Sequence, residues 1–433
     1  MPTSRATPSE GLDQRPPDRA PSRAMAEEAA GAPGRGAAGR PRVGLVLTGG
    51  GARAAYQAGV LSGVLELLDP DRRPGFRNPF DIVCGTSAGA INAAALACRA
   101  HQPHRAVDHL CSLWQALHTR DIYYSDAARL MRTGLQWLGM LSLGWIRPQL
   151  SSYAPHSLLD NEPLSGLLCR TLNFSRLQTN LDRGHLSALA ITATAYTTGE
   201  HLTFYQARQS IQPWSRTLRR AVACPIGVDH LMASSAIPFV FPARAILTGG
   251  RTLWCGDGSM RQLAPISSAI HLGAGRIFVI GTNYRDETSP GIRDLDPPYP
   301  NLAQVAGHTL SNIFLDGVSM DMERMERINE LLARIPANRL KSESLRPIHA
   351  LMIAPSRSLD ELALEHLDEL PGAVRTLFRV LGVSPRRIEP GGGALASYLL
   401  FESGYTRSLI ALGRADSLSQ AEKVIAFFKE WSA

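Results

Sequence analysis

The sequence predicts a three-layer α/β/α protein, in which helices cover both faces of a mostly parallel central sheet. Two short apolar runs, 43–47 and 80–84, have the length and composition of buried strands. A glycine-containing turn follows each run, and helical patterns follow the turns over 54–68 and 90–100. This alternation favours parallel pairing, because two parallel strands need a crossover connection, which a helix supplies.

The remaining elements of this first part follow from their residue patterns. Residues 54–68 place Tyr56, Val60 and Val64 on one side of a predicted helix. The alanine-rich segment 90–100 is typical of a helix buried against a sheet. We expect further strands over 188–195, 202–205, 245–247 and 276–281.

After about residue 300 the pattern becomes mostly helical and predicts additional C-terminal helices. Apolar residues recur at helical spacing over 318–335, and the segments 359–381 and 420–431 indicate further helices. One more strand is expected over 349–353. We therefore divide the chain into a tail at 1–41, an α/β domain at 42–290, and a mainly helical extension at 291–433 packed on the core.

The first 41 residues are rich in Pro, Ala, Gly and Arg and have no apolar period, which predicts disorder. Met25 is an alternative start. The N-terminus lacks an apolar signal segment, and no apolar run reaches the roughly 18 residues of a membrane-spanning helix. The six cysteines are scattered, which suits reduced thiols better than a disulfide framework. The predicted location is the cytoplasm, with peripheral contact at the inner membrane face as an alternative.

The formal net charge of +7 comes almost wholly from arginine. No basic run is interleaved with aromatic residues, so the sequence does not predict nucleic-acid binding. Weak attraction to an anionic membrane surface and a solvated surface without a charged partner both remain open.

A G-x-S-x-G run, Gly85-Thr86-Ser87-Ala88-Gly89, lies between a predicted strand and a predicted helix. In that context a sharp turn lifts the serine oxygen clear of the backbone, and Gly85 and Gly89 leave room for the turn to close. The serine also lies at a helix N-terminus, where free amides favour negative charge. We expect Ser87 to be a nucleophile; the alternative is a tight turn with a capping serine.

The triplet Gly49-Gly50-Gly51 follows the first predicted strand, and its amides can face an anion. One interpretation is a dinucleotide motif of the G-x-G-x-x-G/A type that includes Ala54. Its acidic partner would be Asp69 or Asp71, but these lie in a Pro/Arg turn instead of at a strand end. We therefore favour an oxyanion hole. Arg53 would then position the loop or face an anionic head group, unless it is a surface arginine.

A serine nucleophile needs a base to take its proton. No histidine, including His230, His271 and His349, lies in a sequence context that indicates a catalytic base. Asp257, which two glycines bracket after an apolar stretch, is the better candidate, although Asp-Gly is also a common turn.

Together these motifs resemble those of the bacterial patatin-like phospholipases over roughly 42–284. The run 49–53 is similar to the family's oxyanion motif, 85–89 to its nucleophile elbow, and Asp257-Gly258 to its aspartate-glycine motif. The stretch 233–242 matches a fourth motif just upstream of the aspartate. The resemblance implies a Ser–Asp dyad without a histidine, and supporting roles for Arg53, Gly85, Gly89 and Gly258.

Two positions depart from the family pattern. Ala54 occupies a place where the family usually has glycine, and Ser259 occupies one where it usually has glycine or alanine. Both side chains are small, so we expect the backbone geometry to be preserved.

The resemblance implies a lipid acyl hydrolase, a serine esterase of lipid metabolism that needs no cofactor and no metal. Ser87 would attack an acyl carbonyl, the amides of Gly50 and Gly51 would hold the oxyanion, and water would release the acyl group. The alternatives are an acyltransferase, whose related fold requires a histidine, and a catalytically silent regulatory protein.

The segment 134–146 is apolar, contains two tryptophans and has arginines at both ends. It is too short to span a bilayer, so the alternatives are an interfacial segment, a lid over the site and an internal core helix.

Overall fold

The computed structural model describes residues 40–143, 157–284, 317–336, 345–381 and 393–432, together with residues 305, 339 and 383. The tail predicted to be disordered lies almost wholly outside these residues. The first part of the chain forms β1 (Val43–Leu47), η1 (Gly51–Ala54), α2 (Ala55–Leu68), β2 (Ile82–Thr86), α3 (Ala88–Cys98), α4 (Pro103–Ala116), α5 (Thr119–Ile122) and α6 (Ala127–Leu143).

The middle of the chain completes most of the sheet. It forms α7 (Glu162–Thr171), α8 (Phe174–Asp182), β3 (Ala188–Ala195), β4 (His201–Ala207), β5 (Ser215–Arg216), β6 (Arg219–Ala223), α9 (Val228–Ser234), β7 (Arg244–Thr248), β8 (Arg251–Asp257), η3 (Gly258–Arg261), α10 (Ser267–His271) and β9 (Arg276–Ile280).

The last part of the chain is mostly helical, with one strand. It forms α12 (Gly317–Ala333), β10 (His349–Ile353), α14 (Leu359–Glu365), η4 (Leu367–Glu369), α15 (Gly372–Leu381), α16 (Ala394–Leu399), α17 (Ser403–Ser419) and α18 (Ala421–Ser432). The segment 359–381 is therefore interrupted and not one continuous helix. Pro371 lies at the break, immediately before α15, where its missing amide proton is tolerated.

Within the described residues, the strands form one ten-stranded sheet, which confirms the predicted α/β class. Its order is β10-β9-β1-β2-β3-β4-β6-β5, and the five strands from β10 to β3 are parallel to their neighbours. Strand β4 is antiparallel to β3, and the hairpin β7–β8 adds antiparallel pairing at one end of β3. The glycine loop 49–51 and the turn at Ser87 lie at the carboxyl ends of two of these parallel strands, β1 and β2.

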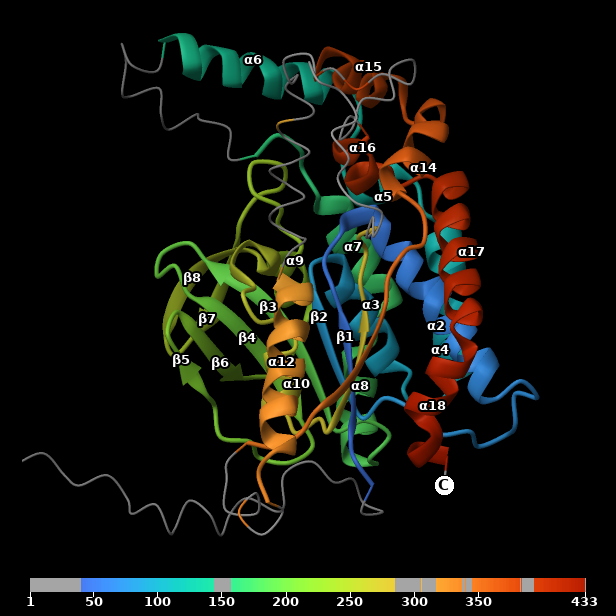
Figure 1. Ribbon diagram of the computed structural model, residues 1–433. Coiled ribbons are helices and arrows are strands. Elements are labelled where there is room, and N and C mark those ends of the chain that lie inside the picture. The colour runs from blue at the N-terminus through green and yellow to red at the C-terminus, as the bar shows by residue number, and fades with distance from the viewer. Residues whose placement is uncertain are drawn as a thin grey trace, which may run out of the picture.

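Helices cover both faces of the sheet, because successive residues of its buried strands point to opposite sides. Leu45 and Leu47 pack with α2, α3, α4 and α17 on one face, whereas Val46 packs with α10 and α12 on the other. In Figure 1, α12 crosses the front of the sheet, and α17 lies along α2 at the right.

Strand β8 takes over an edge of β3 where β2 ends. The pairing of β2 with β3 stops at Thr86 opposite Thr192, and the next residue, Ala193, pairs with Asp257 of β8. Because Ala193 also pairs with Leu202 of β4, β8 must lie on the edge that β2 has left. The register therefore places Asp257 next to the residue that follows Thr86.

Candidate active site

Ser87 occupies the tight turn between β2 and α3. Its backbone is in an unfavourable region, with φ 55° and ψ −130°, and α3 begins at the next residue. The side chain is 1% exposed. A Cβ at Gly89 would overlap the carbonyl oxygens of Leu47 and Thr48, so the close approach of α3 to the end of β1 requires glycine there.

Asp257 is the hydrogen-bond partner of Ser87. The Ser87 hydroxyl donates to Oδ2 of Asp257 at 2.6 Å, and the amide of Ser259 donates to Oδ1 at 2.9 Å. Asp257 is fully buried. Burial raises the pKa of Asp257 to about 6, although the hydrogen bonds from Ser87 and Ser259 act in the opposite direction. A carboxylate with this pKa is a better proton acceptor than an ordinary aspartate and is still mostly ionised at neutral pH.

The aspartate turn is held as closely as the serine turn. Gly258 follows the aspartate, and a Cβ at this position would overlap the carbonyl oxygen of Thr192 on β3. Ser259, where the motif led us to expect glycine or alanine, supplies the amide that bonds Asp257.

The glycine loop 49–51 lies beside the serine at the carboxyl end of β1. Thr282 donates its hydroxyl proton to the carbonyl oxygen of Gly49 at 2.8 Å, which ties the loop to the end of β9. Gly51 has φ 55°, and a Cβ on it would overlap the carbonyl oxygen of Tyr398. Within the described part of the chain, the buried amides of Gly50 and Gly51 have no hydrogen-bond acceptor.

Arg53 is buried behind the glycine loop and is 4% exposed, which excludes a surface role. Its Nε donates to Ser397 Oγ at 2.8 Å, its Nη1 donates to Asn283 Oδ1 at 3.1 Å, and its Nη2 pairs with Asp360. The guanidinium carbon lies 3.9 Å from the ring centre of Tyr398. Arg53 therefore joins the glycine loop to residues near the C-terminus.

An apolar cavity of about 40 Å³ opens next to Ser87. Gly51 and Ser87 lie at one part of its wall, and aliphatic and aromatic side chains from α3, α4, α7 and the 233–242 stretch form most of the rest. Trp114 and Phe401 stack with their ring centres 6.4 Å apart and form part of the lining. Ser87 thus faces a narrow space with a mostly apolar lining.

The histidines considered in the sequence lie elsewhere. His230 accepts a hydrogen bond from the amide of Gly227, His271 stacks on Trp214, and His349 is on the edge strand β10. No histidine among the described residues bonds Ser87 or Asp257.

Several contributors to the site were not predicted. Ser234, whose hydroxyl accepts from the amide of Ser87 at 2.8 Å, lies within the 233–242 stretch, so the resemblance could have indicated it. Asn283, Asp360 and Ser397 have no motif of their own, and only the three-dimensional structure brings them to Arg53.

Part of the apolar segment 134–146 is helical. It begins within α6, where Met131 and Leu135 are 68% and 63% exposed, and its last residues, 144–146, lie outside the described part of the chain. None of the described helices is long and apolar enough to cross a membrane.

The chain is similar to known proteins over the region that forms this site. The sequence model of the patatin-like phospholipase family matches residues 45–270. The chain is 34% identical over 241 residues to "Uncharacterized protein YjjU" of Escherichia coli strain K12; the match spans 56% of this chain and 52%, about half, of that relative. VipD from Legionella pneumophila is similar at 12% identity over 87% of this chain and 69% of that chain, with a TM-score of 0.28, too low to bear on the fold. The family match extends over more than half of the sequence, and the chain belongs to the patatin-like phospholipase family.

Proposed function

We propose that this protein is a lipid acyl hydrolase that uses Ser87 as nucleophile and Asp257 as general base. Membership of the family supports a lipid hydrolase in general terms. The observation that carries the residue assignment is the 2.6 Å hydrogen bond from the Ser87 hydroxyl to a buried carboxylate. This is the geometry that a base needs to take the proton of its nucleophile.

The first chemical step forms an acyl-serine. The Ser87 oxygen attacks the ester carbonyl carbon as its proton passes to Oδ2 of Asp257, and the carbonyl oxygen becomes an oxyanion. The free amides of Gly50 and Gly51 donate hydrogen bonds to that oxyanion, a contribution of about 3 kcal/mol for a well-placed donor. The carbon–oxygen bond to the leaving alcohol then breaks, and the proton held by Asp257 passes to that alcohol.

The second step regenerates the enzyme. Asp257 takes a proton from water, the resulting hydroxide attacks the acyl-serine carbonyl, and a second oxyanion forms in the same place. When this intermediate collapses, the fatty acid leaves and the proton on Asp257 returns to the Ser87 oxygen. These steps use only groups of this chain and water.

The apolar cavity supports a lipid as the source of the acyl group. Its lining offers aliphatic and aromatic contacts to a hydrocarbon chain and excludes water from the reacting carbonyl. The substrate class is therefore a phospholipid, lysophospholipid or neutral acyl ester. The exposed Met131 and Leu135 of α6 support peripheral contact with a membrane through 134–146, on the cytoplasmic side.

Active-site labelling with a fluorophosphonate tests the assignment, because this probe phosphonylates an activated serine. We expect the wild type to be labelled, Ser87→Ala to be unlabelled, and Asp257→Asn to react at least a hundredfold more slowly, the usual contribution of a general base. Hydrolysis of acyl esters of glycerophosphocholine, followed by release of fatty acid, should show the same order.

Ser235 supplies a matched control. It lines the same cavity, and its buried hydroxyl has no hydrogen-bond partner in the described structure. Ser235→Ala should therefore retain labelling. Wild-type protein that resists the probe would overturn the proposal, and labelling that persists in Ser87→Ala would overturn the choice of nucleophile.

A further inference from the structure

A second cavity lies at the amino-terminal ends of the central strands, whereas Ser87 lies at their carboxyl ends. The residue before β1 is Arg42, the residue before β2 is Asp81, and the residue before β3 is Ser187; all three line a cavity of about 200 Å³. Because β1 and β2 are parallel and five residues long, the cavity lies about 17 Å from the carboxyl ends that carry the glycine loop and Ser87. It is therefore separate from the proposed active site.

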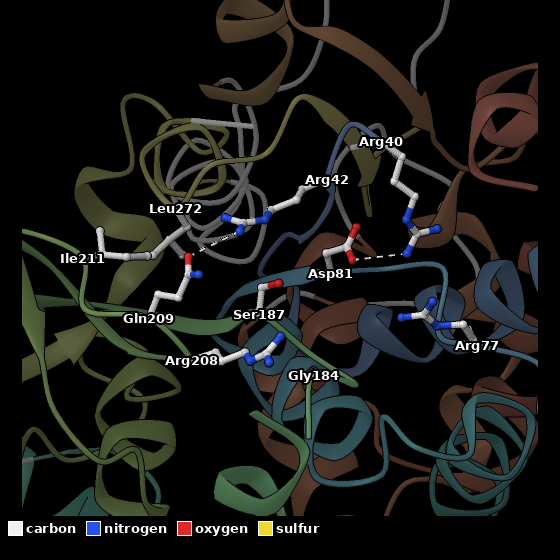
Figure 2. Close-up of a pocket in the computed structure, with 10 residues that line it drawn as sticks. All are labelled: Arg40, Arg42, Arg77, Asp81, Gly184, Ser187, Arg208, Gln209, Ile211 and Leu272. Atoms are coloured by element: carbon white, nitrogen blue, oxygen red, sulfur yellow. Dashed lines mark hydrogen bonds and ion pairs between the residues drawn. The ribbon is translucent and has the colours of Figure 1, made fainter. Parts of the chain in front are cut away.

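Among the residues that the structure describes, four arginines and one carboxylate line this cavity: Arg40, Arg42, Arg77, Arg208 and Asp81. In Figure 2 the guanidinium groups of Arg77 and Arg208 extend toward Ser187 and Asp81, which lie between them. The basic groups come from three separate loops, so the fold and not a local run of sequence collects them.

The single carboxylate already has its partners. Asp81 lies 3.5 Å from Arg40 through Oδ1, and its Oδ2 accepts the amide proton of Val43 at 2.9 Å. Its backbone carbonyl also accepts from the amide of Ser187 at 2.6 Å. Asp81 thus ties the first residues of three strands together, which explains one acidic group among the arginines.

The other three arginines form no ion pair within the part of the chain that the structure describes, although the positive charges of Arg42 and Arg77 act on the nearby Asp81 carboxyl and lower its pKa against the effect of burial. No described carboxylate pairs with Arg42, Arg77 or Arg208. Toward the described residues, the Arg42 side chain donates one long hydrogen bond, of 3.4 Å to Gln209, and its buried Nε has no acceptor among them. Burial lowers the pKa of the neighbouring Arg346, and the positive charge of Arg42 lowers it further.

We propose that this cavity binds a phosphate monoester. Such a group carries up to two negative charges and three terminal oxygens, which match several guanidinium groups at once. Arginine forms paired hydrogen bonds with phosphate that lysine cannot form, and the basic groups among the described lining residues are all arginines. The hydroxyl of Ser187 adds a neutral donor, and the volume accepts a phosphate with a small ester group.

Two sources can supply that group, a soluble phosphate ester or the head group of phosphatidic acid. The first arm of the test titrates glycerol 3-phosphate into the full-length protein at constant ionic strength, by calorimetry and by thermal shift. The second arm measures co-sedimentation with vesicles of ether-linked phosphatidylcholine, with and without ether-linked phosphatidic acid. Ether lipids have no acyl ester, so the result does not depend on the proposed hydrolase activity.

We expect saturable binding of glycerol 3-phosphate and a rise in melting temperature. Arg42→Gln and Arg208→Gln should each weaken binding by about tenfold or more, since each removes charged hydrogen bonds. Asp81→Asn keeps an acceptor for Val43 and removes a negative charge, so it should tighten binding. Arg251→Gln, an exposed arginine away from the cavity, is the matched control and should bind as the wild type does.

The two arms distinguish the sources and can refute the proposal. If the protein binds glycerol 3-phosphate but does not co-sediment with the vesicles, the ligand is a free phosphate ester. If it co-sediments with vesicles that contain phosphatidic acid and not with those that lack it, the ligand is a lipid head group. The proposal is overturned if neither arm shows binding, or if Arg42→Gln and Arg208→Gln bind as tightly as Arg251→Gln. Labelling of Ser87 by a fluorophosphonate is unaffected by either result.

Discussion

The raised pKa of Asp257 predicts how fast Ser87 reacts at different pH values. The base must be ionised to accept the serine proton, so the rate follows the ionised fraction of Asp257. With a pKa of about 6, that fraction is about 91% at pH 7 and about 9% at pH 5. The reaction should therefore slow about tenfold between these two pH values. An aspartate with the ordinary value of 3.8 would lose only about 6% of its ionised form over the same range.

The assay is the second-order rate constant for fluorophosphonate labelling between pH 4.5 and pH 8. Labelling measures the attack of the serine directly and avoids any limit set by lipid binding or product release. Circular dichroism at each pH controls for loss of the fold, and Ser87→Ala controls for labelling elsewhere. A rate that stays constant from pH 7 to pH 5, or a midpoint near pH 4, would refute the assignment of Asp257 as the buried base.

Three further predictions concern stability and positioning. First, since the pKa of Asp257 is raised from 3.8 to about 6, its ionisation destabilises the fold by about 3 kcal/mol at neutral pH, and this penalty disappears as the pH falls below 3.8. Asp257→Asn should therefore melt at a higher temperature than the wild type at pH 7, with the difference vanishing near pH 4; an equal or lower melting temperature at pH 7 would contradict the role of burial. Second, Asp360→Asn removes the charge that pairs with Arg53, so the glycine loop should lose its position and kcat should fall tenfold or more at a similar KM; an unchanged kcat would separate the loop from its anchor. Third, Gly89→Ala should destabilise the fold by about 3 kcal/mol or more in urea unfolding, because its Cβ meets the backbone of β1; a loss below 1 kcal/mol would show that the turn can relax.

The apolar runs of the sequence predicted most of the sheet, and the G-x-S-x-G motif predicted the tight turn that carries Ser87. The run 43–47 is β1, whereas the run 80–84 overlaps β2, which begins and ends two residues later, at Ile82–Thr86. Both runs are short and apolar and lead into a glycine-containing turn, which favours a buried strand. The prediction of one helix over 359–381 was wrong, since the apolar spacing continues across the end of one helix and the start of the next, where Pro371 lies. The division of the chain at about residue 290 stays a prediction, although β10 joins the central sheet beside β9.

The residues that surround Ser87 could not be predicted from local sequence patterns alone. The Asp257 turn resembled a family motif, but its position beside Ser87 depends on β8 taking over the edge of β3. Asp360 and Ser397 had no local pattern at all, because a residue that binds a distant arginine needs only the right place in space. Long-range pairings of this kind are invisible to spacing rules, which read only neighbours along the chain.

The anchoring of Arg53 has a consequence for the order of synthesis. Its partners Asp360 and Ser397 follow it by 307 and 344 residues, so they leave the ribosome long after both Ser87 and Asp257. Until then the guanidinium behind the glycine loop lacks two of its three side-chain acceptors, and the loop in a nascent chain that already carries Ser87 and Asp257 lacks most of its anchor. If Ser87 and Asp257 hydrolyse esters as proposed, hydrolysis should therefore begin only after Asp360 and Ser397 have been made, and a ribosome-bound chain that stops short of them should be inactive.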